Sequence, residues 1–137
     1  MITLQAAFLA DRGQANPDAT FMVWRGGITQ VASNSFPAPI NLTMILRIEV
    51  DREDAETLHE YGMRIALGGR EIGPWRTVPI ALRVPEGEDH VYLNMVNELR
   101  FLVQEVGTVT IESMMDDRPL PTLRLRVTQA PQPPSPT

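Results

Sequence analysis

The chain has 137 residues, no cysteine and a formal net charge of −5 at pH 7. This length predicts one domain, and the lack of cysteine excludes disulfides, thiolate metal ligands and a cysteine nucleophile. The acidic balance argues against a nucleic-acid partner, which requires a basic surface. No segment approaches the ~20 apolar residues that cross a bilayer, so we expect no membrane partner.

All 12 basic residues are arginine. Genome base composition and selection against side-chain amines both account for this, and the sequence does not separate them. In either case, chemistry that needs a side-chain amine, such as a Schiff base, is excluded. Residues 1–10 are largely apolar but contain no basic residue, so they lack the charged region of a signal peptide. We therefore expect a cytoplasmic protein.

Two segments in the first 50 residues predict strands, in which successive side chains point to opposite faces. One is Ile2–Asp11, which is followed by the turn signal Asn16-Pro17-Asp18. The other is Leu42–Val50, in which every even-numbered residue is apolar. The same alternation places Ile45 on the outer face of its strand.

Between these segments, Thr20–Trp24 predicts a short strand that could lie at the edge of a sheet. We expect Phe21 and Val23 to face inward, which leaves Met22 and Trp24 on the outer face.

Glycines mark two breaks in the extended pattern. Arg25-Gly26-Gly27 predicts a bulge or tight turn between two strand halves, the second being Ile28–Val31. Gly68-Gly69 predicts a hairpin between Met63–Leu67 and Arg70–Ile72, because glycine adopts the positive φ angles of such a turn without strain.

The middle of the chain is less regular. Glu53–His59 predicts one or two helical turns, and Pro74 and Pro79 indicate an irregular stretch or an edge strand. Further short strands are expected at Ile80–Val84, Val91–Val96 and Leu99–Val103, with an interruption at Asn97-Glu98.

The clearest pattern is the hairpin that Val106–Val127 predicts. Thr108–Ser113 and Leu123–Val127 both alternate, and the loop between them contains turn residues. We expect the register that places Val109, Ile111 and Ser113 opposite Val127, Leu125 and Leu123. That register would bring Glu112 beside Arg124, an opposite-charge pair worth about 0.2–1 kcal/mol.

About eight short strands with almost no helix indicate an all-β protein, an antiparallel β-sandwich that is immunoglobulin-like or similar. A closed barrel is the alternative that alternation leaves open. We assign residues 1–129 to this domain and residues 130–137 to a disordered tail, because four of these eight residues are proline.

Several segments resemble a family of small uncharacterised bacterial all-β proteins, a domain of unknown function. Residues 10–14 and 20–28 are similar to the family's "L-x-D-x-A" strand end and its "K-L-N-I-x-G-G-G-W" segment, while Leu42–Val50, Gly68-Gly69 and the strand from Gly107 match later elements. The chain departs from the pattern at Met22, Arg25 and Ile28. The resemblance implies a β-sandwich and no function.

No constellation points to catalysis or to a cofactor. His59 and His90 each precede or follow an acidic residue, Glu60 and Asp89, but no serine lies in a nucleophile elbow. Two histidines in loops are most simply exposed. Three acidic clusters, at residues 51–54, 86–89 and 116–117, lack the spacing of a Ca²⁺ loop. We therefore predict no catalytic residue, no metal ligand and no cofactor.

Exposed tryptophan and methionine are enriched in protein interfaces. We predict that Met22, Trp24 and Trp75 form an interface, with Met114 and Ile45 also on outer faces, and that Trp75 in its Pro-flanked loop is either an anchor or a core plug. The expected function is a non-enzymatic interaction or assembly subunit with a protein partner or self-association. The alternative is a sandwich that binds a small ligand or Ca²⁺ through its end loops.

Overall fold

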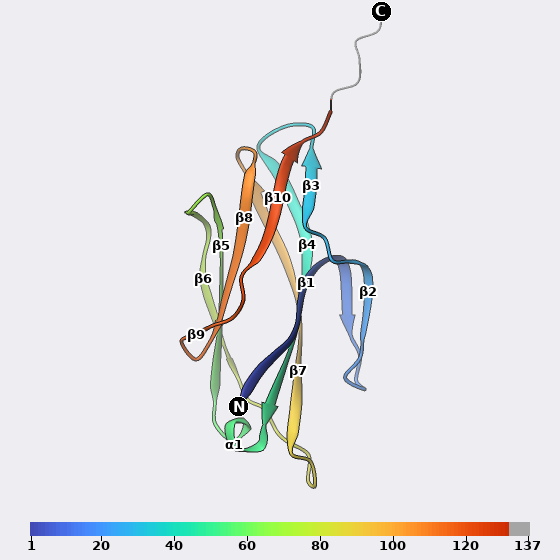
Figure 1. Ribbon diagram of the computed structural model, residues 1–137, viewed down its shortest axis with the longest axis vertical. Coiled ribbons are helices and arrows are strands. Elements are labelled where there is room, and N and C mark those ends of the chain that lie inside the picture. Colours follow the sequence, from blue (N-terminus) through green and yellow to red (C-terminus); the bar gives the residue numbers. More distant parts are fainter. Residues whose placement is uncertain (132–137) are drawn as a thin grey trace, which may run out of the picture.

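Two β-sheets dominate the computed structural model, which describes residues 1–131 (Figure 1). One sheet has the strand order β2-β1-β4-β7, and the other has the order β3-β10-β8-β5-β6 with β9 paired to β8. The pairing is antiparallel except between β3 and β10. The predicted all-β sandwich is confirmed, with ten strands in place of about eight.

The elements have the following bounds: β1 Ile2–Ala15, β2 Phe21–Gly26, β3 Gln30–Ser33, β4 Ala38–Asp51, α1 Arg52–Ala55, β5 His59–Leu67, β6 Arg70–Ile80, β7 His90–Val103, β8 Gly107–Met115, β9 Arg118–Pro119 and β10 Leu123–Gln129.

The core lies between the sheets and is built on β4, which pairs with both β1 and β7. Its even-numbered residues, such as Leu46 and Ile48, are at most 7% exposed and form one cluster with Val109, Ile111 and Leu125 of the other sheet. Fully burying a side chain of this kind contributes about 1.5–3 kcal/mol. The predicted alternation in β4 therefore places one whole face of this strand in the core between the two sheets.

Two turns follow directly from their residues. Gly68 and Gly69 have φ angles of 55° and 84° and join β5 to β6, which confirms the predicted hairpin. The strand β6 is an edge strand that contains Pro74 and Pro79, which confirms the edge interpretation of that stretch.

The predicted register of the last hairpin is wrong by two residues. Leu125 lies opposite Val109 rather than Ile111. The reason is that β8 continues to Met115 and turns back through Asp116 and Asp117, both at positive φ, to pair with β9. As a result, Glu112 forms its ion pair with Arg64 of β5 and not with Arg124.

Three further predictions of local structure are wrong. After Gly26 the chain does not continue the same sheet but crosses to the other one, where β3 pairs with β10. No break occurs at Asn97-Glu98, because β4 pairs with β7 along its whole length. Residues 81–89 form a loop rather than a strand, and the Arg52 guanidinium donates to the carbonyl oxygens of Pro85 and Glu88 at 2.8 and 2.6 Å.

The helix α1 is a single turn, shorter than the predicted range, and the Asp51 carboxylate caps it by accepting from the Asp54 amide at 3.1 Å. In the part of the chain that the structure describes, no helix has the length and apolar character to cross a membrane. The predicted tail at residues 130–137 lies outside the described residues except for its first two.

Candidate functional site

The strand β2 and the second half of β1 form an arm at one side of the molecule, at the right of Figure 1. Pairing between β1 and β4 ends at Ala10, and beyond that point β1 pairs only with β2. Five of the six residues of β2 are exposed. The exposed fractions are 49% for Met22, 36% for Val23 and 39% for Trp24.

The arm explains two errors in the predicted orientations. Val23 was expected to face inward, but it is exposed because β2 has left the sandwich and has no core on either face. Ile45 was expected on an accessible outer face, but its exposure is 0%. The arm covers it, and Gly13 permits the contact because a Cβ atom at that position would clash with the Cδ1 atom of Ile45. Met114, also expected on an outer face, is partly buried.

Charged side chains brace the arm internally. The guanidinium carbon of Arg12 lies 4.7 Å from the centroid of the Trp24 ring, and Arg25 forms an ion pair with Asp11 at 3.1 Å. Asp18 accepts from the amide and hydroxyl of Thr20 at 3.2 and 2.5 Å, and these contacts lower the pKa of the Asp18 carboxyl. Residues 19–24 are uncharged, and they lie between the acidic Asp18 and the basic Arg25.

The backbone of β2 is hydrogen-bonded on one side only. The Asn16 amide donates to the Thr20 carbonyl oxygen at 2.8 Å, which makes these two residues a hydrogen-bonded pair. Hydrogen-bonded and non-hydrogen-bonded pairs alternate along an antiparallel ladder. Met22 and Trp24 therefore bond to β1, whereas the N–H and C=O groups of Phe21 and Val23 point to the open side.

The other sheet edges carry features that discourage pairing. Two prolines and a register shift interrupt β6, and β3 is only four residues long. The strand β7 carries exposed Glu98 and Arg100. By contrast, Phe21–Trp24 contains no charge and no proline. The strands β3 and β7 also contain uncharged runs, but residues 91–97 of β7 are partly buried. The strand β2 differs because its uncharged run presents Met22, Val23 and Trp24 at 36–49% exposure.

Trp75 does not belong to this surface. It lies in β6 rather than in a loop, and β6 is at the opposite side of the molecule from β2 in Figure 1. Trp75 is 39% exposed, and its ring centroid lies 5.3 Å from the guanidinium carbon of Arg64, so it is not a core plug. The structure thus brings Met22 and Trp24 together and separates Trp75 from them.

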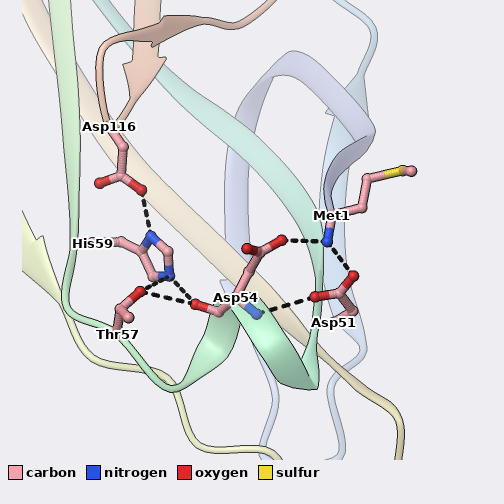
Figure 2. A network of polar contacts seen from close by, with 6 residues as sticks. All are labelled: Met1, Asp51, Asp54, Thr57, His59 and Asp116. Atoms are coloured by element: carbon pink, nitrogen blue, oxygen red, sulfur yellow. Dashed lines mark hydrogen bonds and ion pairs between the residues drawn. The ribbon is translucent and has the colours of Figure 1, made fainter.

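A second feature is the polar network around His59, which Figure 2 shows. His59 was expected to be exposed beside Glu60, but it is only 6% exposed and its Nδ1 atom contacts the Asp116 carboxylate. Its Nε2 atom contacts the Asp54 carbonyl oxygen. Both partner atoms only accept hydrogen bonds, so the doubly protonated imidazolium is the form that satisfies both.

The His59–Asp116 contact shifts the titration of both groups. The hydrogen bond to Asp116 raises the pKa of His59, although burial opposes the shift. Burial alone would raise the pKa of Asp116, but hydrogen bonds from His59 and from the Glu60 amide, at 2.8 Å for the latter, bring it below its ordinary value. The pair ties the start of β5 to the turn between β8 and β9, and the contact with the Asp54 carbonyl oxygen ties His59 to α1. No local pattern could have linked positions 59 and 116.

The remaining candidate residues have structural partners. His90 packs edge-on against Tyr92, with ring centroids 5.1 Å apart. Asp51 and Asp54 both bind the amino group of Met1 (Figure 2). Within residues 1–131, the His, Asp and Glu side chains form no group of three or more that could hold a metal ion. A cavity of about 430 Å³ lies between α1 and the 81–89 loop, and neither histidine lines it.

Comparison with protein families places the chain in a known family. A family model described as "Family of unknown function (DUF6941)" matches residues 5–128, a range that includes both the arm and the sandwich. No curated protein matches the sequence.

Proposed function

We propose that this chain, which belongs to the family of unknown function DUF6941, is a non-enzymatic interaction or assembly subunit that binds a protein partner through β2. The observation that carries the proposal is the edge formed by Phe21–Trp24, which is apolar and uncharged, exposes three of its four residues, and has backbone groups on its open side that lack partners within the described residues.

An open edge of this kind favours pairing with another strand, because each added backbone hydrogen bond satisfies groups that otherwise depend on water. Met22 and Trp24 add the side-chain types that are enriched in interfaces. The stacking of Arg12 on Trp24 restricts the ring, which lowers the entropy lost when a partner binds. The edge therefore offers backbone hydrogen bonds and apolar contacts to a partner, and its Trp24 ring is already ordered before binding.

The test is a comparison of Trp24→Glu with Trp75→Glu. The two tryptophans have the same exposure, 39%, and each contacts an arginine, but they lie on different sheets. Each full-length variant is isolated gently from its own host, and its assemblies are measured by native mass spectrometry and by sedimentation equilibrium at about 100 μM, where a weak assembly is populated. Far-UV circular dichroism verifies that each variant is folded.

We expect Trp24→Glu to weaken the assembly at least tenfold, because it removes an aromatic anchor and places a carboxylate on the edge. Trp75→Glu should leave the assembly intact. If folded Trp24→Glu retains the wild-type mass and partner binding, the proposal is wrong.

A further inference from the structure

We infer that the partner of β2 is a second copy of this chain, paired antiparallel with β2 about a twofold axis at Met22. This inference rests on the proposed function and names its partner. The two four-stranded sheets would join into one continuous sheet of eight strands.

The backbone geometry suits this pairing. With the axis at Met22, Phe21 of one copy lies opposite Val23 of the other, and these are the residues whose N–H and C=O groups point to the open side of β2. Each of the two Phe21–Val23 pairs exchanges two hydrogen bonds. The contact therefore gains four backbone hydrogen bonds without breaking any within the arm.

The charges at the two ends of the segment favour antiparallel pairing with a second copy, which carries an acidic residue at one end and a basic residue at the other. Asp18 precedes the uncharged segment and Arg25 follows it, so antiparallel copies bring Asp18 of each copy near Arg25 of the other. Arg25 has a 79% exposed side chain that can serve a second carboxylate besides Asp11. Parallel pairing would bring like charges together at both ends, which is unfavourable.

The side chains are also self-complementary. Met22 faces Met22, Phe21 faces Val23 and Trp24 faces Thr20, so apolar groups meet apolar or small neutral groups and no charge is opposed within the segment. The contact involves only about five to seven residues per copy, far fewer than the roughly 20–30 of a standard interface. We therefore expect a weak dimer with a dissociation constant of about 10–100 μM.

The absence of cysteine allows a direct test of the register. In the inferred dimer, Met22 forms a non-hydrogen-bonded pair with itself, at a Cα separation of about 4.5 Å. That distance lies within the disulfide range. Full-length Met22→Cys at about 100 μM should therefore form a disulfide dimer under mild oxidation, measured by non-reducing mass spectrometry.

Two single-cysteine variants serve as matched controls. Val78→Cys places the thiol on β6, at a position of similar exposure, 45% against 49% for Met22. Thr20→Cys lies on the same arm but, in this register, about 13 Å from its counterpart. We expect Met22→Cys to cross-link at least tenfold faster than either control. Sedimentation equilibrium of the wild-type chain should show a monomer–dimer equilibrium.

Equal rates for Met22→Cys and Val78→Cys would indicate random collision and would overturn the inference, as would faster cross-linking of Thr20→Cys. The proposed function would survive that result if a different polypeptide still bound in a way that Trp24→Glu abolished. If Trp24→Glu also had no effect on any assembly, both would be wrong.

Discussion

Replacement of Asp116 by asparagine isolates the charge of the carboxylate that holds the buried His59. Asparagine has the same shape, and it tolerates the positive φ angle of 50° at this position. The change weakens two charge-assisted contacts, one from the His59 ring and one from the Glu60 amide. The structure therefore predicts destabilisation without loss of the turn.

The magnitude follows from the difference between charged and neutral hydrogen bonds. Charged ones contribute about 1.5–3 kcal/mol and neutral ones about 0.5–1.5 kcal/mol. The Asp116 side chain is 36% exposed, which places the loss at the lower end because solvent screens the charge. We expect a loss of about 1–2 kcal/mol in the free energy of unfolding, or about 3–8 °C in Tm for a chain of this size.

The pH dependence has a defined sign. The pKa of His59 is raised on folding, so its contribution is complete below about pH 6.5 and is lost as pH rises through the folded-state pKa. The pKa of Asp116 is lowered, so its contribution is complete above about pH 4 and is lost as pH falls through the folded-state pKa. The difference in free energy of unfolding between the wild-type chain and Asp116→Asn should therefore be largest between about pH 4 and pH 6.5.

Urea denaturation followed by far-UV circular dichroism at pH 5.5 and pH 9 measures this difference. The difference in free energy of unfolding between the wild-type chain and Asp116→Asn should be smaller at pH 9 than at pH 5.5. Asp117→Asn is the matched control, because Asp117 occupies the same turn at positive φ but does not contact His59. An equal gap at both pH values, or an equal effect of Asp117→Asn, would refute the role given to the ion pair.

Two further predictions concern packing. Gly13→Ala should lower the free energy of unfolding by about 1–3 kcal/mol, because the added methyl group meets the buried Cδ1 atom of Ile45. Ile45→Val removes that atom, so a double-mutant cycle in urea should show a smaller loss for the combined variant than the sum of the two single losses. Additive costs would show that the arm does not press on Ile45. Ile111→Ala in the core should cost about 2–5 kcal/mol, whereas Thr110→Ala on the outer face should cost far less; similar midpoints for the two would contradict the assigned faces of β8.

The features that the sequence predicted correctly are local ones. Alternation over Leu42–Val50 identified the central strand, because one face of that strand is buried along its whole length. Gly68-Gly69 identified its hairpin, because the turn needs two positive φ angles. Alternation in β8 and β10 also placed the correct side chains in the core despite the wrong register, because a shift of two residues preserves the face.

The features that the sequence did not predict depend on contacts between distant residues. His59 is buried because its Nδ1–H donates a hydrogen bond to the carboxylate of Asp116, 57 positions later. Ile45 is buried because β1 bends at the arm and brings Gly13 onto it. Met22 and Trp24 were placed on an outer face by alternation, but their exposure arises because the whole of β2 leaves the sandwich. Alternation carries no information on such a departure.

Amide hydrogen exchange of β2, resolved by residue with NMR, tests the central claim most directly. In dilute protein the Phe21 and Val23 amides should exchange rapidly, whereas those of Met22 and Trp24, which bond to β1, should be protected. On assembly, at high concentration or with an isolated partner, Phe21 and Val23 should gain protection and the amides of β6 should not change. If assembly leaves Phe21 and Val23 unprotected, or if protection appears instead on β6 or β7, then β2 is not the binding edge.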